Sequence, residues 1–264
     1  MTQQPQLVND LLWLARELGH EPRQFALLGE GNVSARASDD TFWVKASGTS
    51  MATLQKGDVS LVSLPKVLGL LEHTYLSDDA IDIALINDVL VDTTHKKPSV
   101  ETFLHALCLN AGATWVGHTH TLSVNQIICS QLGAEPFLGH IFPDAIVVCG
   151  AKPAVIPYVD PGFVLAKAVQ AELARFYEAE GNLPKVILME NHGPVALGQS
   201  SQEVLNIMLM LDKWAKTLLG TYQIQGPRFL TQDDTNRIDN RNDEAYRRKQ
   251  LVQNPTKISS TKVS

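Results

Sequence analysis

The chain has 264 residues, 44% of them hydrophobic and 19% charged, with a formal net charge of −6 and a pI of about 5.7. This is the composition of a globular protein with enough apolar residues for a sizeable core. The acidic balance provides no basic surface for a nucleic-acid backbone or an anionic membrane, so we expect neither as a partner.

The N-terminus and the cysteines indicate a cytoplasmic protein. The N-terminus has no basic start and no long apolar core, so a signal peptide is not expected. No window of about 20 apolar residues is present to span a bilayer. Three cysteines, Cys108, Cys129 and Cys149, lie in apolar runs without a CxxC pattern, and we expect them to be buried free thiols.

The first part of the chain contains helical and strand patterns. Leucines at helical spacing predict a helix over residues 6–18. The segment 27–51 is rich in Gly, Asn, Ser and Asp, which predicts turns and short strands with Asp39 and Asp40 at the tip of a hairpin. A further helix is expected over residues 79–91.

Helices and strands alternate in the middle of the chain. The segment "PSVETFLHALCLNAG" predicts a helix that begins near Pro98 and Ser99 and ends at Gly112. The segment "TWVGHTH" predicts a short strand and "LSVNQIICSQLG" a helix. Two short apolar runs, "AIVVCG" and "AVIPYV", are then expected to be strands.

The last part of the chain continues the alternation. A long helix is expected over residues 162–180, followed by the buried strand "KVILMENHG" and the strand "PVALG". Ser200 and Glu203 form a capping-box pattern that opens a helix to about residue 219. We therefore expect one α/β domain over residues 1–253, with helices covering a sheet. Residues 254–264 form a polar tail.

Two histidines, His118 and His120, stand one residue apart in the predicted strand "TWVGHTH". Residues two apart on a strand point to the same face, and about 6.5–7 Å of backbone rise separates them. The pair suits two ligands of one divalent ion, and a catalytic zinc usually takes three protein ligands. His192, which ends another buried strand before a Gly-Pro turn, is the best third candidate. The alternative for the pair is two half-buried histidines hydrogen-bonded to the backbone.

The remaining histidines are weaker candidates. His105 lies inside a predicted helix and is expected to be partly buried and hydrogen-bonded, with a supporting role behind the metal ligands as the alternative. His140 is ambiguous. Three others lie in polar segments and are predicted at the surface: His20, His73 and His95.

Glu101 lies in the first turn of the helix predicted from Pro98. Free backbone N–H groups and the helix dipole favour a carboxylate there. One interpretation is simple stabilisation of the helix start, and the other is an acid/base group or a displaceable metal ligand. Its position on the helix does not separate the two.

Two loops, "GEGNVSAR" and "KASGTSM", could hold an anion through backbone N–H groups, hydroxyls and amides, and Ser99 at a helix start adds a donor of the same kind. Neither loop is a P-loop, because the pattern GxxxxGK[ST] is absent, and the GxGxxG dinucleotide signature is absent as well. Each loop alone is more often a turn. Together on one side of a metal they would form a phosphate pocket.

The segments "GNVSAR", "KASGT", "PSVE", "HTH" and "NHG" occur in this order between about residues 29 and 198. As an ordered set they resemble the class II aldolase/adducin family, the zinc-dependent aldolases of sugar phosphates. The resemblance implies a single three-layer domain, with a central mixed or antiparallel sheet between helices. The segment "FLTQDDTNRIDNRNDEAYRRKQL" further resembles the end of the aldolase part of bifunctional rhamnulose-phosphate aldolase/dehydrogenase proteins.

The resemblance also implies roles for single residues. His118, His120 and His192 match the family's metal ligands, and Glu101 matches the acidic residue that acts in proton transfer. Val100 departs from the small hydroxyl residue that is common at its position. The positions that hold the substrate phosphate are matched by Asn32, Ser47, Gly48 and Ser99.

The implied activity is that of a lyase. We expect reversible cleavage of a ketose 1-phosphate, similar to rhamnulose or fuculose 1-phosphate, to dihydroxyacetone phosphate and an aldehyde, with Zn²⁺, Mn²⁺ or Co²⁺ as cofactor. The family further implies a cytoplasmic homotetramer with its site at a subunit interface and an assisting tyrosine from the neighbour. The alternatives are an epimerase, dehydratase or decarboxylase on the same scaffold, or a non-catalytic adducin-like module.

Overall fold

The computed structural model describes residues 3–92, 96–241 and 243. The predicted polar tail, residues 254–264, lies outside the described residues, as does His95. Among the described residues, no helix combines the length and the apolar character needed to cross a membrane.

One seven-stranded sheet runs through the described part of the chain in the order β3-β2-β1-β4-β7-β6-β5. Neighbouring strands pair antiparallel except for β5 and β6, which are parallel, so the sheet is mixed, as expected. The strands are β1 (Asn32–Arg36), β2 (Thr41–Lys45), β3 (Val59–Ser63), β4 (Trp115–His118), β5 (Ala154–Ile156), β6 (Val186–Met189) and β7 (Gly193–Gly198).

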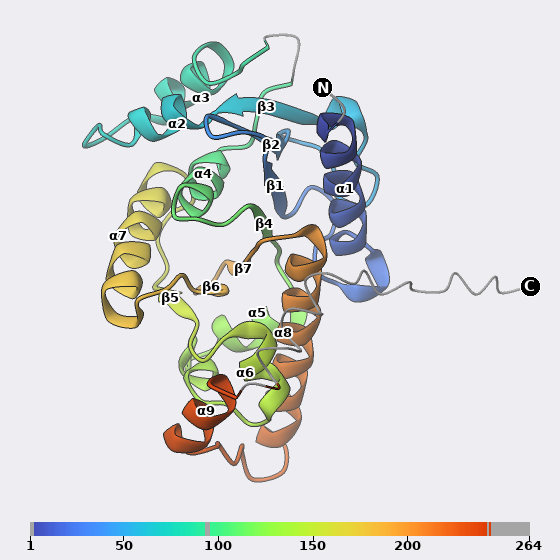
Figure 1. The fold of residues 1–264 in the computed structure, drawn as a ribbon, viewed down its shortest axis with the longest axis vertical. Helices are drawn as coiled ribbons and strands as arrows, with labels where there is room; N and C mark the ends of the chain where they lie inside the picture. The colour runs from blue at the N-terminus through green and yellow to red at the C-terminus, as the bar shows by residue number, and fades with distance from the viewer. Residues whose placement is uncertain (1–2, 93–95, 242, 244–264) are drawn as a thin grey trace, which may run out of the picture.

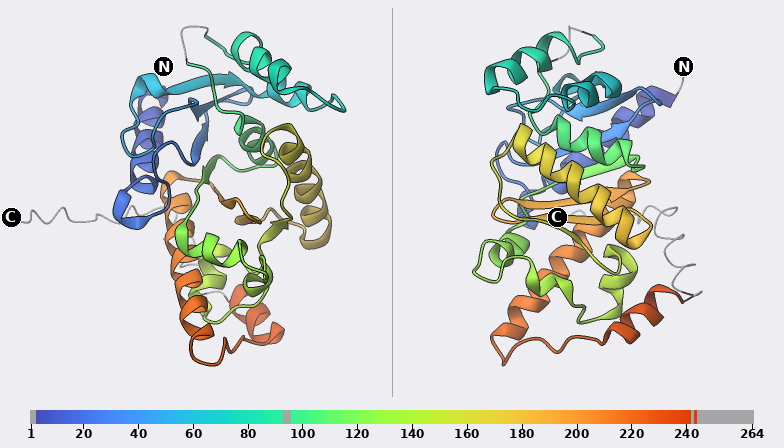
Figure 2. Two further views of the ribbon diagram at one scale, coloured as in Figure 1. Left: turned by 180° about the vertical axis from the view of Figure 1, so that it is seen from behind. Right: turned by 90° about the vertical axis from the view of Figure 1, so that its left-hand side faces the viewer.

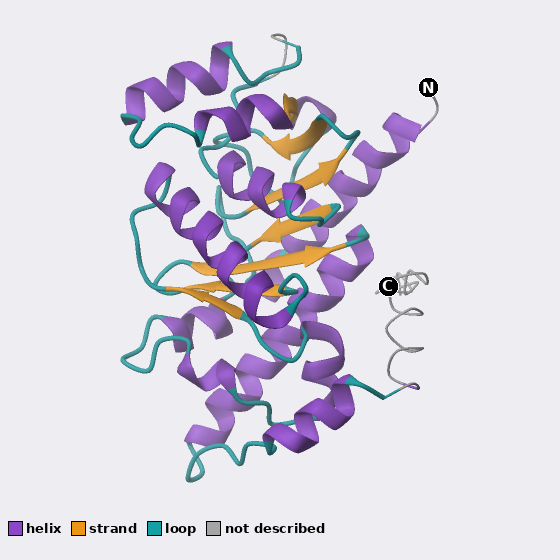
Figure 3. Cartoon of the chain, turned by 60° about the vertical axis from the view of Figure 1, so that its left-hand side comes forward, coloured by secondary structure: helices purple, strands orange, loops and turns teal. Residues whose placement is uncertain are grey.

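Helices cover both faces of this sheet and give the molecule three layers (Figures 1 and 3). One face is covered by α1 (Gln3–Leu18), α5 (Leu122–Ile128) and α8 (Ser201–Tyr222), and α6 (Pro143–Cys149) packs between α8 and α9 (Gln232–Asp239). The other face carries α2 (Leu64–Leu70), α3 (Asp78–Asn87), α4 (Thr102–Asn110) and α7 (Phe163–Glu180). Short 3-10 turns are η1 (Glu21–Arg23), η2 (Lys56–Asp58) and η3 (Glu135–Leu138).

Each face of the sheet has its own hydrophobic core, because successive side chains of a strand point to opposite faces. Val33 and Ala35 of β1 pack into the core under α1 and α8. Phe42 and Val44 of β2 pack into the core under α4 and α7. The two views of Figure 2 show these two helical layers from behind and from the side.

The segment "AIVVCG" is helical, and its prediction as a strand was wrong. It belongs to α6, which has Pro143 in its first turn, where a missing N–H costs no hydrogen bond. All side chains from Ala145 to Cys149 are buried, so the helix has no polar face in this stretch. A short run that is apolar on all sides does not distinguish a buried helix from a buried strand by periodicity.

Other predicted elements lie within a few residues of their expected places. The helices over residues 6–18 and 162–180 are α1 and α7, and the hairpin tip at Asp39 and Asp40 joins β1 to β2. At the start of α8, Ser200 Oγ accepts a hydrogen bond from the Glu203 N–H at 3.1 Å.

Two expectations need correction. The helix expected from Pro98 begins later, with α4 at Thr102, because Pro98 forms a β-bridge with Ala46. Cys108 and Cys149 are buried free thiols as expected, but Cys129 is exposed. Cys129 is the C-cap residue of α5, one position beyond the end of that helix.

Candidate metal centre

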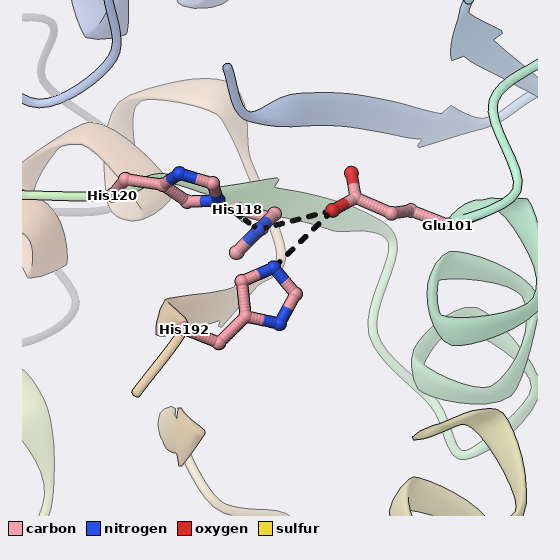
Figure 4. A group of neighbouring side chains, drawn as sticks. All are labelled: Glu101, His118, His120 and His192. Atoms are coloured by element: carbon pink, nitrogen blue, oxygen red, sulfur yellow. Dashed lines mark hydrogen bonds and ion pairs between the residues drawn. The ribbon is translucent and has the colours of Figure 1, made fainter. Parts of the chain in front are cut away.

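Three histidines and one glutamate from three parts of the chain meet at one end of the sheet (Figure 4). His118 is the last residue of β4, and His120 follows it outside the strand. His192 lies in the turn between β6 and β7, and Glu101 lies immediately before α4. The N–H of His120 donates to the carbonyl of Phe25 at 2.8 Å, which holds this segment beside the loop that precedes β1.

The four side chains are close enough to share one ion. His118 Nε2 lies 3.2 Å from His120 Nε2 and 3.2 Å from Glu101 Oε1. His192 Nε2 lies 3.6 Å from the same carboxylate oxygen. One ligand atom from each of the four residues lies within 4.8 Å of the other three. The rings converge as expected, although β4 ends at His118 and His120 lies just beyond it.

The donor set fits a divalent metal ion of the zinc type. Zinc is bound by imidazole nitrogen and carboxylate oxygen, and three protein ligands leave a position open. His118 Nδ1 lies 3.0 Å from the Pro194 carbonyl oxygen, to which it donates, so a neutral ring has its lone pair on Nε2, toward the cluster. His118 is completely buried, and the side chains of His192 and Glu101 are 11% and 16% exposed. The ligand roles of the histidines stay a prediction.

In the cluster, the negative charge of the Glu101 carboxylate and the neighbouring imidazoles shift one another's pKa. Burial by itself would raise the pKa of Glu101, but the charge on His118 and hydrogen bonds from His118 and His192 hold it well below its usual range. Burial by itself would lower the pKa of His118, but the Glu101 carboxylate raises it above its usual value. Burial and the charges on His118 and His192 lower the pKa of His120 to about 4. The site therefore favours positive charge beside Glu101.

His105 lies behind Glu101 and is fully buried, more deeply than expected. Its Nδ1 lies 2.7 Å from the hydroxyl of Ser34 on β1. Burial lowers the pKa of His105 to about 3, so the ring is neutral near pH 7. It is hydrogen-bonded, as expected, and it is not one of the four clustered residues.

His140, the ambiguous histidine, belongs to the core on the α8 side. Its ring stacks on Trp214 with centroids 4.6 Å apart, and its Nε2 donates to the carbonyl of Ala151 at 2.9 Å. His20 and His73 are exposed, as expected. None of these three belongs to the cluster.

Two glycines allow the chain to pack closely around the cluster. A Cβ at Gly193 would lie 2.2 Å from the carbonyl oxygen of Thr119 and 3.1 Å from Cδ2 of His120. Gly31 has φ 72, and a Cβ there would lie 2.7 Å from the carbonyl oxygen of His118. Real Cβ atoms do not approach other atoms this closely, so the positions of both histidines depend on these glycines.

Asn32 lies beside the cluster, because its backbone pairs with that of His118 across β1 and β4. The side chain is completely buried. Its Oδ1 accepts a hydrogen bond from the Val33 N–H at 2.9 Å, and its Nδ2 has no partner in the described structure. A buried donor without a partner is costly, so this amide is suited to receive an anionic or polar ligand.

The other predicted anion-binding residues lie in two adjoining loops. The loop after β2 carries Ser47 and Gly48, and the Ser47 N–H donates to the Lys97 carbonyl at 2.9 Å. Ser47 and Gly48 are exposed, and Gly48 has φ 72. Ser99 is half-buried, and its Oγ accepts from the Glu101 N–H at 3.3 Å. The structure places these loops together on the Glu101 side of the site, and their binding role stays a prediction.

Lys45 is a residue of this site that the sequence interpretation did not single out. It ends β2, is 2% exposed, and its Nζ donates to the Thr49 carbonyl at 2.8 Å. Burial lowers its pKa, while the carboxylates of Glu101 and Asp58 oppose that effect. The lysine at the start of "KASGT" was the available signal, because a buried ammonium beside a loop of hydroxyls suits an anion.

A cavity of about 630 Å³ opens elsewhere, between η3, β5 and α7. Both of its basic residues already have partners: Lys152 pairs with Glu180, and Arg175 pairs with Glu172. None of the four clustered residues lines it. The chemistry of the histidine cluster, rather than cavity size, identifies the candidate site.

The model of the family described as "Class II Aldolase and Adducin N-terminal domain" matches residues 9–219. The chain belongs to this family. An L-fuculose 1-phosphate aldolase structure superposes with a TM-score of 0.66 at 15% identity, covering 89% of this chain and 94% of the aldolase. At that identity the likeness concerns the fold, and it agrees with the expected α/β architecture.

Two sequence relatives show how varied this family is. YuxG of Bacillus subtilis, described as an uncharacterized oxidoreductase, is 27% identical over 85% of this chain. The chain spans only 32% of the length of YuxG. The 3-oxo-tetronate 4-phosphate decarboxylase of Escherichia coli K12 is 28% identical over 79% of this chain and 84% of the enzyme. The family includes aldolases and decarboxylases, so membership alone does not fix the reaction.

Proposed function

We propose that the chain is a divalent-metal-dependent lyase of the class II aldolase type. Its reaction would be the reversible cleavage of a ketose 1-phosphate to dihydroxyacetone phosphate and an aldehyde. The observation that carries this proposal is the convergence of His118, His120 and His192 beside the buried carboxylate of Glu101. We further propose, from the family resemblance, a cytoplasmic homotetramer whose sites lie at subunit interfaces.

The three imidazoles would hold the ion, for which Zn²⁺, Mn²⁺ and Co²⁺ are the candidates. Such an ion supplies a Lewis acid that stabilises the enediolate charge left when the carbon–carbon bond breaks. Neutral histidines leave that positive charge undiminished, whereas further carboxylate ligands would reduce it. The Glu101 carboxylate lies beside His118 and His192. It would therefore also lie beside substrate oxygens bound at the ion that these histidines hold.

Glu101 would exchange a proton with the enediolate carbon or oxygen. Its Oε1 faces His118 and His192, and its backbone N–H is engaged by Ser99 Oγ at 3.3 Å. In this position Glu101 would act as a proton acceptor at the edge of the cluster, on a backbone held by Ser99. Fixed placement of a base against the reacting carbon is the orientation contribution to the rate.

The anionic end of the substrate would lie on the Glu101 side of the site. The buried amide of Asn32, the Ser47–Gly48 loop and Ser99 would provide donors there, and the buried ammonium of Lys45 would provide charge. The chain is acidic overall, so this local set, rather than the net charge, must attract a phosphate.

A panel of ketose 1-phosphates tests this function, with release of triose phosphate as the readout. We expect turnover with at least one member of the panel, loss of turnover in a chelator, and recovery when a divalent ion is restored. His120→Ala is the control, because it removes one ligand from the cluster. Full activity in the chelator would reject the mechanism.

Decarboxylation of a 3-oxo sugar-acid phosphate is the second candidate reaction. The 28% identical Escherichia coli relative carries that activity in its name. Mass analysis of products separates the two reactions, because one gives an aldehyde with triose phosphate and the other gives CO₂. An isomer of equal mass would indicate an epimerase, and loss of water a dehydratase.

A further inference from the structure

The loop that precedes β1 lies against His120. The N–H of His120 donates to the carbonyl of Phe25 at 2.8 Å, and the N–H of Leu122 donates to the carbonyl of Gln24 at 3.0 Å. The same loop carries Glu30, whose Oε1 lies 3.7 Å from Nδ1 of His120. One loop therefore fixes the backbone of His120 and brings a carboxylate to its ring.

The Glu30 carboxylate is held in place by a tight turn. Its Oε2 accepts a hydrogen bond from the Leu27 N–H at 2.9 Å, and the Glu30 N–H donates to the Leu27 carbonyl at 2.9 Å. Leu28, inside this turn, has a backbone φ of 53°, and the residue is 89% exposed. A leucine in the left-handed region is strained and persists only where its surroundings impose it. With Oε2 engaged by the turn, Oε1 is the oxygen that faces His120.

The ring of His120 presents its other nitrogen to the cluster, because Nε2 lies 3.2 Å from Nε2 of His118. A neutral imidazole carries one proton, so a ring that offers the Nε2 lone pair to a cation carries its proton on Nδ1. That N–H then lies on the side of the Glu30 carboxylate, whose Oε1 is 3.7 Å from Nδ1. The other tautomer would set the Nδ1 lone pair against the same negative charge.

We infer that Glu30 is a positioning residue of the metal centre, which holds His120 in the tautomer and orientation that offer Nε2 to the ion. This inference rests on the proposed function. The Pro194 carbonyl lies on the corresponding side of His118 and accepts a hydrogen bond from its Nδ1 at 3.0 Å. Ligating histidines usually donate their second N–H to such a group, and its loss typically costs 10- to 100-fold in metal affinity or activity. The alternative is that Glu30 only closes its turn.

Glu30→Gln separates the two roles. The glutamine oxygen can still accept from the Leu27 N–H, but its amide nitrogen then faces Nδ1 of His120 and carries no negative charge. We expect the affinity for Zn²⁺ and Co²⁺, measured by competition with a chromophoric chelator, to fall about 10-fold or more. The visible absorption of bound Co²⁺ should shift as well, and the urea midpoint of the metal-free protein should stay unchanged.

Glu178→Gln is the matched control, because it removes the same charge from an exposed position on α7. It should change neither the metal affinity nor the urea midpoint. Unaltered metal affinity and Co²⁺ absorption in Glu30→Gln would overturn the inference and assign Glu30 to its turn alone. A wild-type protein that bound no divalent ion would instead reject the proposed metal centre, so the two failures are distinguishable.

Discussion

Glu101 combines a buried position with three histidines nearby, and this combination decides its charge. Burial favours the neutral acid, but His118 and His192 outweigh burial and hold the pKa of Glu101 well below its usual range. The helix start offers no side-chain cap through Glu101, so plain stabilisation of α4 is not what engages its carboxylate. The histidines engage it instead.

The Glu101→Gln variant should still bind the metal ion but should lose most of its catalytic turnover. Three imidazoles remain as ligands, so the metal content should be close to that of the wild type. Turnover should fall by about 10²- to 10⁴-fold, the usual contribution of a positioned acid or base. Steady-state kinetics and metal analysis of the same samples provide the test. Wild-type turnover in this variant would remove Glu101 from the mechanism.

The three cysteine thiols should react with a disulfide reagent at very different rates. Burial raises the pKa of Cys108 and Cys149 to about 12, and both are completely enclosed. Cys129 is exposed, although burial raises its pKa above its usual value. A disulfide reagent should therefore modify one thiol per chain in the folded protein and the other two only after unfolding. Three fast thiols, or none, would contradict this assignment.

At the scale of elements, the sequence correctly predicted the helices and turns that depend on residue periodicity and local capping patterns. The leucine spacing of α1 and the Ser200–Glu203 pattern of α8 both marked real helices. It did not predict α6, whose apolar run fits either kind of element. The residues of the cluster followed from motif order, but the burial of Lys45 near Glu101 and the approach of Glu30 to His120 depend on tertiary packing.

The turn between β6 and β7 places His192, and Gly193 beside it allows the close approach. Gly193→Ala would force a Cβ to 2.2 Å from the Thr119 carbonyl, so Thr119 and His120 must move. We expect a loss of about 1–3 kcal/mol in unfolding free energy and a large loss of metal affinity. Urea unfolding and metal titration measure these two effects.

Gly220→Ala is the control for that change. Gly220 is exposed near the end of α8, and a Cβ there meets nothing within 4 Å. Alanine should stabilise the helix by up to about 1 kcal/mol and leave the metal affinity unchanged. Equal behaviour of the two variants would mean that the close packing at Gly193 is unimportant.

At the scale of the whole molecule, the sheet separates two hydrophobic cores, and the candidate site lies at the ends of its central strands. The neutral buried ring of His105 makes this arrangement sensitive to acid. Burial lowers the pKa of His105 to about 3, whereas the unfolded chain takes up that proton near 6.5. The unfolded state therefore binds more protons below about pH 6.5, and stability contributed by this group is lost as the pH falls from there toward 3.

The unfolding free energies of the wild type and of His105→Gln should therefore depend differently on pH. Below pH 6.5, the unfolding free energy of metal-free wild type should fall with pH more steeply than that of His105→Gln. The extra slope approaches about 1.4 kcal/mol per pH unit when one proton is involved. Urea unfolding between pH 8 and pH 5 measures both slopes. Parallel curves would show that His105 does not stay neutral in the folded protein.

The proposed lyase activity requires that three imidazoles share one cation beside Glu101. Anomalous diffraction at the zinc edge, from crystals grown with Zn²⁺, tests it most directly. We expect one strong peak about 2.0–2.1 Å from Nε2 of His118, His120 and His192. An empty cluster, or a zinc ion bound only at other residues, would contradict it.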